Sequence, residues 1–160
     1  MKEQIKRKQQ ILNKDQIDEI LLKNTSGVLS LLDENNNPYG VPLNYAYING
    51  KLIFHTSKFG YKIDLIKRNQ NCSFTVIDQD KVVEEDYTSL YKSVIIQGKI
   101  KIIENKEEIV NYMNLFTDKY VPFKEERPDI IKRNLPILSI LELTIEQVSG
   151  KCALDLVNKK

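Results

Sequence analysis

The dipeptide Asn49-Gly50 constrains the fold more than any other feature, because it stands between two runs that look like β-strands. The run before it alternates between two faces, and one of them carries Val41, Leu43, Tyr45 and Tyr47. Asn and Gly both tolerate positive φ, so Asn-Gly between strand-like runs is a strong hairpin signal. We therefore predict that Tyr39–Ile48 and Lys51–Thr56 form one antiparallel hairpin.

Further strand-like runs predict a barrel. They are "GVLSLLD" from Gly27, "CSFTVID", "YKSVIIQGKIKIIE" and "PILSILELTIEQVSG". Gly98 interrupts the third of these runs, where glycine typically marks a bulge or bend. The polar stretch Lys81–Leu90 is expected to be a loop. Together these runs predict a mainly β protein of six mostly antiparallel strands. This pattern favours a small barrel with peripheral helices.

Four helices are predicted around these strands. Asp15 is the expected N-cap of the first, which places Ile17, Ile20 and Leu21 on one face. A short second helix covers about Tyr61–Asn69. Asn105 and Glu108 have the spacing of a capping box for the third, and a short fourth helix follows Pro128. The face of the third helix is expected to carry Ile109, Met113, Phe116 and Tyr120.

Composition narrows the class of protein. The length of 160 residues favours one domain, 1–160, with the basic start at 1–13 as a candidate flexible arm. A formal net charge of +2 gives no support for nucleic-acid binding. No apolar run approaches the roughly 18 residues of a membrane span, and we expect no secretory signal. Cys72 and Cys152 fit neither a zinc nor a redox spacing, so we expect a cytoplasmic protein with free thiols and no metal site.

The stretch "FHTSKFGYK" gathers reactive groups at a strand-to-helix turn. Strand alternation puts His55 on one face and Thr56 on the other. Lys62 shares a helix face with apolar residues of the next turn, so it should lie on the inner side of the first turn. A cation is unfavourable there by about 0.3–1 kcal/mol, because the start of a helix carries partial positive charge. A bound phosphate would reverse that penalty.

Each of these residues also has an ordinary structural explanation. A first-turn lysine can extend its amino group to water, and a single histidine on a strand can serve only packing. The segment is no P-loop, because the glycines and the Gly-Lys-Ser/Thr element are missing. The aromatic residues on the strands allow a third alternative, a barrel that stacks nucleic-acid bases, although strand spacing favours their burial in a core.

The chain resembles the flavin-binding split-barrel family that includes pyridoxamine 5'-phosphate oxidase, and within it the nitroimidazole-reductase-like branch associated with nitroimidazole resistance. The likeness runs from about Ile17 to Val148. The pieces that carry it are "GVPLNY", "FHTS", "KIDLIKRN" and "YKSVIIQG", in this order and spacing.

The resemblance implies a six-stranded antiparallel split β-barrel and a homodimer that binds FMN in a cleft between two barrels. It also implies that His55 is catalytic and that Lys62 holds the phosphate. The full set of implied cofactor-binding residues is Val41, Pro42, Leu43, Asn44, Tyr45, His55, Thr56, Tyr61, Lys62 and Ser93. Tyr61 stands where the family pattern has an arginine, so the phosphate has one charged partner fewer.

The implied activity is FMN-dependent reduction of nitroaromatic or similar small aromatic substrates, with NAD(P)H as a candidate electron donor. His55 is the expected proton donor, since its ordinary pKa lies near neutrality. The chain has no Trp and lacks the Arg- and Trp-rich carboxyl-terminal motif of the oxidase itself, which disfavours pyridoxamine phosphate oxidation. A flavin- or haem-binding module without turnover is the alternative, and the fold also hosts deazaflavin-using relatives.

Overall fold

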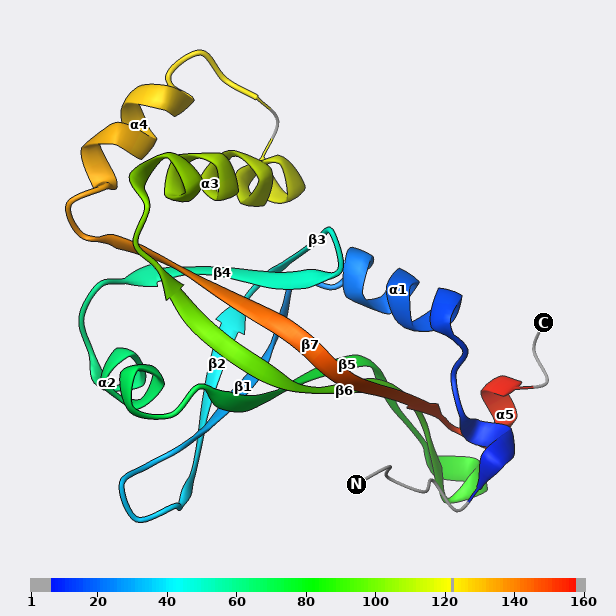
Figure 1. Cartoon of the computed structure of the whole chain (residues 1–160). Coiled ribbons are helices and arrows are strands. Elements are labelled where there is room, and N and C mark those ends of the chain that lie inside the picture. The colour runs from blue at the N-terminus through cyan, green and yellow to red at the C-terminus, as the bar shows by residue number, and fades with distance from the viewer. Residues whose placement is uncertain (1–6, 122, 158–160) are drawn as a thin grey trace.

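The computed structural model describes residues 7–121 and 123–157 and contains one antiparallel sheet that curls into a barrel (Figure 1). The prediction of a mainly β, antiparallel barrel is confirmed, with seven strands rather than six. The sheet order is β2-β1-β5-β6-β7-β4-β3. The strands are β1 (Ser26–Leu32), β2 (Pro38–Asn44), β3 (Ala46–Ile48), β4 (Lys51–Ser57), β5 (Asn71–Val83), β6 (Thr88–Ile103) and β7 (Leu138–Cys152).

The predicted single hairpin is divided at Tyr45. As predicted, Asn49 and Gly50 make the turn, with φ of 50° and 77°, and β3 pairs with β4. However, β2 pairs with β1 at the opposite edge of the sheet, so the prediction that all of Tyr39–Ile48 pairs with Lys51–Thr56 is wrong. Tyr45 alone joins β2 to β3, which are the two edge strands of the sheet. The sheet therefore has to curl to bring these two edges together.

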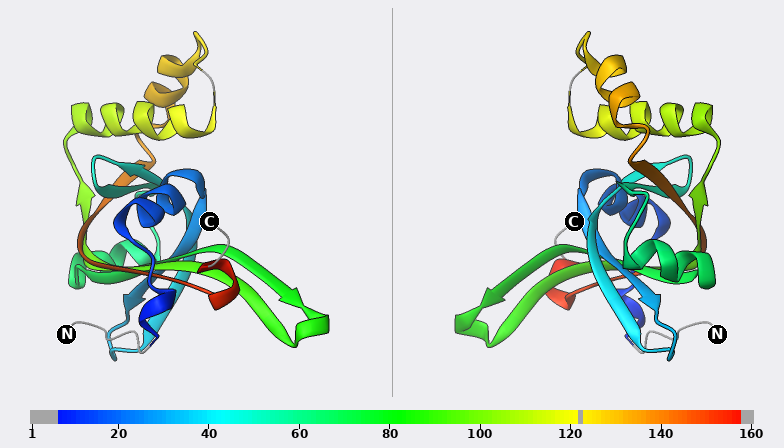
Figure 2. Two further views of the ribbon diagram at one scale, coloured as in Figure 1. Left: turned by 90° about the vertical axis from the view of Figure 1, so that its right-hand side faces the viewer. Right: turned by 90° about the vertical axis from the view of Figure 1, so that its left-hand side faces the viewer.

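The prediction that Lys81–Leu90 forms a loop is also wrong. β5 and β6 remain paired to Val83 and Thr88 and are joined by a short 3-10 turn, Glu84–Asp86. Figure 2 shows this hairpin projecting from the body of the barrel. Its polar side chains lie in solvent while its backbone groups pair across the hairpin, so polarity here reflects exposure and not irregular structure.

Gly98 marks an irregularity of β6, as predicted. The register between β6 and β7 shifts between Gln97 and Gly98. A Cβ atom at this position would lie 2.0 Å from the carbonyl oxygen of Thr144. The close approach of the two backbones therefore requires glycine.

Helices cover the outside of the barrel: α1 (Lys14–Lys23), α2 (Tyr61–Arg68), α3 (Lys106–Tyr120), α4 (Arg127–Asn134) and α5 (Leu154–Val157). The cap of α1 is Asn13 and not Asp15, because Asn13 and Gln16 form a reciprocal capping box. Asn105 caps α3 as predicted, since its side chain accepts a hydrogen bond from the N–H of Glu108.

The core has two parts, one on each face of β4. Leu52 and Phe54 point into the barrel interior, where Phe74 is also fully buried. Ile53 points the other way, into a smaller cluster formed with Phe116 of α3. The predicted alternation along β4 is thus confirmed. Of the aromatic residues on the predicted strands, Tyr45, Phe54 and Phe74 are buried and Tyr47 is partly buried.

The start of the described chain is docked on the barrel. Ile11 forms a β-bridge with Lys151, and Leu12 is buried. The part of the candidate flexible arm at 7–13 is therefore packed, and 1–6 lie outside the described residues. Cys72 and Cys152 are free thiols, as predicted.

Two sequence expectations concern what the chain does not contain. Within the described ranges, no helix has the length and apolar character needed to cross a membrane. The same residues contain no group of three or more His, Cys, Asp or Glu side chains placed to hold a metal ion.

Candidate functional site

The predicted site residues lie on four elements, apart from Tyr45, which forms the connection between β2 and β3. Residues 41–44 are on β2, with Val41 and Leu43 packed against the barrel core and Pro42 and Asn44 exposed. His55 and Thr56 are near the end of β4, Tyr61 and Lys62 begin α2, and Ser93 is on β6.

The start of α2 has the features of an anion site. Gly60 precedes the helix with φ of 119°, and no side chain caps the first turn. The first N–H groups of a helix lack intrahelical partners, and they carry partial positive charge. Lys62 is half-buried, whereas Tyr61 is exposed and makes an edge contact with the ring of Tyr39, 5.1 Å between centroids.

His55 is held by aromatic stacking. Its ring lies on Phe116 with 4.9 Å between centroids and 27° between planes, and Phe116 stacks in the same way on Tyr120 at 5.0 Å. Both partners come from α3. The imidazole itself is exposed, so the stack orients the ring while leaving it accessible to a ligand.

Two neighbouring cavities meet at His55. The smaller one has a volume of about 310 Å³ and also contains Asn44 and Tyr120 in its wall. The larger one, of about 820 Å³, lies between the end of β4, α3, α4 and the start of β7. Of the predicted residues, Asn44, His55 and Thr56 thus come together at these cavities. The lining of neither cavity includes Val41, Pro42, Leu43, Tyr45, Tyr61, Lys62 or Ser93.

Tyr45 is buried, and its backbone carbonyl binds the end of α3. Its side chain is fully buried, and that burial raises the pKa of its hydroxyl. Its carbonyl oxygen accepts hydrogen bonds from Lys119, at 3.2 Å, and from the Tyr120 hydroxyl, at 2.6 Å. Burial lowers the pKa of Lys119, whose amino group also lies 4.4 Å from the centroid of the Tyr45 ring. The end of α3 therefore fixes the connection between β2 and β3.

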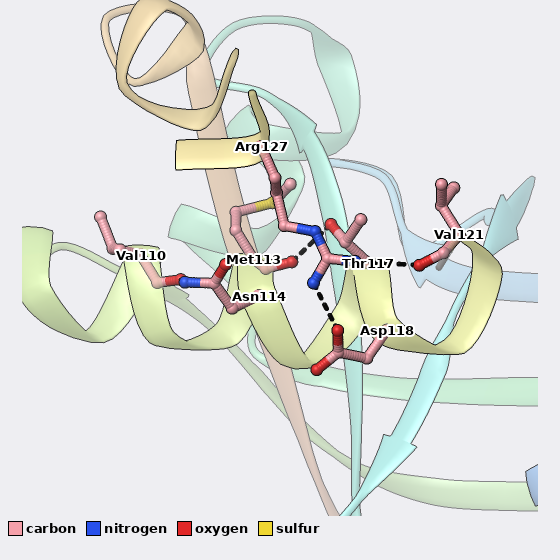
Figure 3. Close-up of polar contacts among 7 residues, drawn as sticks. All are labelled: Val110, Met113, Asn114, Thr117, Asp118, Val121 and Arg127. Atoms are coloured by element: carbon pink, nitrogen blue, oxygen red, sulfur yellow. Dashed lines mark hydrogen bonds and ion pairs between the residues drawn. The ribbon is translucent and has the colours of Figure 1, made fainter. Parts of the chain in front are cut away.

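The roof of the larger cavity was not anticipated from the sequence. Arg127, at the start of α4, is buried and pairs with the carboxylate of Asp118 on α3 (Figure 3). It also donates a hydrogen bond to the carbonyl oxygen of Val121, at 2.9 Å. Figure 3 shows this contact beside Thr117, whose hydroxyl donates to the Met113 carbonyl at 2.6 Å. The pairing depends on the tertiary placement of two helices, and only the Arg-Pro start of α4 hinted at a helix beginning there.

Comparison with known proteins identifies the family. A model of the pyridoxamine 5'-phosphate oxidase family matches residues 13–152, and the chain belongs to this family. Among curated protein sequences, none matches this chain.

Solved structures include several with the same fold. A candidate 5-nitroimidazole antibiotic resistance protein from Bacteroides thetaiotaomicron is 27% identical, with a TM-score of 0.77 over 89% of this chain and 86% of that one. A FAD-binding protein from Mesorhizobium loti is 23% identical, with a TM-score of 0.65 over 89% and 94% of the two chains. A FAD and haem binding protein from Mycobacterium smegmatis is 17% identical, with a TM-score of 0.74 over 88% and 71%. The last two likenesses concern the fold alone.

Proposed function

We propose that the protein is an FMN-dependent reductase of nitroaromatic or similar small aromatic compounds, and that it works as a homodimer. The observation that carries the proposal is the meeting of Asn44, His55 and Thr56 at two cavities. The helix that follows β4 in the chain, α2, starts without a side-chain cap. These features occur in a chain of the pyridoxamine 5'-phosphate oxidase family. Its likeness to a candidate nitroimidazole resistance protein supports the choice of substrate class.

The residues present fit FMN. Its phosphate would lie at the start of α2, where uncapped N–H groups and the half-buried Lys62 offer hydrogen bonds and positive charge. The Thr56 hydroxyl lies on the strand that leads into this turn. The exposed face of β2, with Pro42 and Asn44, would hold the rest of the cofactor. When bound, FMN supplies the redox chemistry, and the protein supplies binding and orientation.

The outer face of the sheet supports a dimer with a shared site. Pro42, Val28, Thr75 and Ile95 lie opposite one another in register across β2, β1, β5 and β6, so they share one face. Ile77 is 63% exposed on the same side of β5, and its register partner is Ser93. A second copy covering this apolar surface would place Ser93 at the interface, on the same face of the sheet as Pro42 of β2.

His55 is suited to protonate the reduced product. Nitro reduction consumes protons as well as electrons, and an imidazole exchanges protons near neutral pH. Because Phe116 holds the ring at one face, its edge can address a molecule in either cavity. The proposed role is therefore proton donation to a substrate, with no part in holding the phosphate.

The cofactor part of the proposal is tested by charge reversal at Lys62. We expect Lys62→Glu to weaken FMN binding at least tenfold, because a carboxylate would face the phosphate. Lys67→Glu is the matched control, since Lys67 is exposed on the same helix but in its last turn. Affinity is measured by quenching of FMN fluorescence. An equal affinity of Lys62→Glu and wild type would discard the phosphate site.

The catalytic part is tested by His55→Phe, which keeps a ring on Phe116 but removes the proton donor. We expect FMN affinity to change less than threefold. The steady-state rate of nitro reduction, with NAD(P)H supplied as the electron donor that reduces FMN, should fall at least tenfold. An unchanged rate would remove His55 from the mechanism. Wild-type protein that binds FMN but consumes no nitro compound would instead be a flavin-binding module without turnover.

A further inference from the structure

The larger cavity, which we call the α3–α4 chamber, is separate from most of the residues expected to hold FMN. Its roof comes from α3, α4 and their connection, and its floor from residues 55–57 of β4 and the start of β7. The chamber does not include Tyr61, Lys62 or Ser93 in its wall. It meets the proposed cofactor site at His55 and Thr56 only. A volume of about 820 Å³ is within the range of small-molecule pockets.

The chemistry of the wall favours an apolar ligand. The largest group of wall residues is apolar, namely Met113, Val121, Ile130, Ile131, Ile137 and Leu138. A few neutral polar groups interrupt it, and they are Thr56, Ser57, Thr117 and Asn134. An apolar wall with a small number of hydrogen-bonding groups is typical of sites for small ring compounds.

The charged residues of the chamber wall are either paired or opposed by a residue of opposite charge. Arg127 is buried, and its guanidinium is already paired with Asp118 and the Val121 carbonyl. Lys124 and Glu126 are exposed and opposite in sign. An anionic ligand would find the buried cation, Arg127, already paired, and the exposed Lys124 offset in charge by Glu126. It would also lose hydration on entering the chamber. The wall therefore favours a neutral molecule over a phosphate or a carboxylate.

The buried Arg127 also explains how the chamber stays open. Its pairing with Asp118 and Val121 joins the start of α4 to the end of α3, although only a short connection links the two helices. The two helices therefore have a fixed separation over the floor. Such a preformed site binds without first ordering its walls.

We propose that the α3–α4 chamber is the site of the electron-accepting substrate, and that this substrate is a small, neutral, largely apolar ring compound. That the bound compound is a substrate depends on the proposed reductase function. That the chamber binds such a compound depends only on the chamber itself. His55 lies where the chamber meets the smaller cavity with Asn44, so a ring in the chamber would face its proton donor.

The first experiment fills the chamber. Met113→Trp adds bulk to the chamber on its border with the smaller cavity, which Met113 also lines. Leu115→Trp adds the same ring to α3 outside both cavities, since Leu115 is partly exposed and lines neither. The probes are 4-nitrobenzamide and 4-nitrobenzoate, which have similar shapes but differ in charge. Calorimetry on FMN-loaded wild-type protein should show the amide binding at least tenfold more tightly than the benzoate. Met113→Trp should weaken amide binding at least tenfold, whereas Leu115→Trp should leave it unchanged.

A second variant covers the case in which Met113→Trp does not fold. Ile137 is in the wall but 62% exposed, so a larger side chain can be accommodated there. The natural chain has no Trp. Ile137→Trp therefore provides a single fluorophore, which bound 4-nitrobenzamide should quench saturably. Leu115→Trp should show no saturable quenching.

Three results would overturn the proposal. One is loss of both FMN affinity and amide binding in Ile137→Trp, because Ile137 lines the chamber and not the smaller cavity; this result would show that the cofactor occupies the chamber. Another is tighter binding of the benzoate than of the amide. The third is equal quenching in Ile137→Trp and Leu115→Trp. If wild-type protein binds no FMN, the reductase function fails, but the same variants still test the chamber in the cofactor-free chain.

Discussion

Glu142 joins α3 to the barrel, and its neutralisation is the sharpest test of how the roof of the site is held. The side chain of Glu142 is buried on β7, and its carboxylate accepts a hydrogen bond from the Tyr112 hydroxyl of α3 at 2.5 Å. Lys51 and Lys101 approach the other oxygen at 3.0 and 3.3 Å. The substitution Glu142→Gln keeps the shape of the side chain and removes its charge.

The magnitude follows from these three partners. A hydrogen bond to a charged group contributes about 1.5–3 kcal/mol, and the Tyr112 contact is the most buried of the three. Both lysines are roughly half-exposed, so each ion pair contributes no more than about 1 kcal/mol. We expect Glu142→Gln to lower the free energy of unfolding by about 2–3 kcal/mol. For a chain of this size that corresponds to a fall in Tm of roughly 4–12 °C.

The effect should depend on pH. Burial by itself raises the pKa of Glu142, but the hydrogen bonds from Tyr112, Lys51 and Lys101 outweigh it and hold the pKa below its ordinary value of 4.5. A depressed folded-state pKa stabilises the protein above the unfolded-state value, and this contribution disappears as the pH falls through the folded-state value. The difference between wild type and Glu142→Gln should therefore be full at pH 7 and shrink below pH 4.5.

Urea unfolding followed by circular dichroism at pH 7 and in the acid range measures this difference. Glu146→Gln is the matched control, because Glu146 is exposed on the same strand. It should change the unfolding free energy by less than about 0.5 kcal/mol. If Glu142→Gln proved as mild as its control at pH 7, the buried carboxylate would not hold α3, and the reasoning would be refuted.

Three further predictions concern single positions. Gly98→Ala should lower the free energy of unfolding by about 3 kcal/mol or more in urea melts, because its Cβ would lie 2.0 Å from the Thr144 oxygen; a neutral effect would contradict the observed register shift. Asn13→Ala should lower the free energy of unfolding by about 1 kcal/mol in the same assay, and Asp15→Ala should lower it clearly less, since Asn13 is the N-cap of α1. A larger loss in Asp15→Ala would instead make Asp15 the cap. Gly60→Ala should cost about 1–3 kcal/mol at its φ of 119° and weaken FMN binding, measured by fluorescence quenching; unchanged affinity would separate the turn from the phosphate site.

Features that depend on neighbouring residues were predictable from the sequence. The turn at Asn49-Gly50 requires positive φ at two successive residues, and the start of α3 requires a side-chain acceptor at Asn105. The irregularity at Gly98 likewise follows from one residue type. Each of these signals is local, so no tertiary partner is needed to interpret it.

Pairing between distant segments was not predictable in the same way. The alternation of residues 39–48 identifies a strand but does not say that it divides at Tyr45 and pairs at two edges of the sheet. The polar stretch Lys81–Leu90 looked irregular because strand patterning assumes one buried face, and the projecting hairpin has none at its tip. Polarity alone therefore does not distinguish an exposed hairpin from a loop.

Tyr45 shows how two sequence arguments diverged within the candidate site. Strand alternation placed Tyr45 on the face of Val41 and Leu43, which pack against the core. The family resemblance placed it among the cofactor-binding residues. The structure buries the Tyr45 ring and leaves Asn44 as the exposed end of β2, in the cavity that contains His55. Alternation was the better guide to the side chain because burial follows the backbone pleat.

The connectivity of the chain separates the two halves of the proposed chemistry. The elements expected to hold FMN, β2 and α2, belong to the barrel and its first connections, whereas the roof of the chamber is an excursion between β6 and β7. Among the predicted site residues, His55 alone lines both cavities. Its ring is oriented by Phe116 of that excursion, although its backbone belongs to the barrel. If His55 is the proton donor, as proposed, a change in α3 that moves Phe116 should alter turnover without altering FMN affinity.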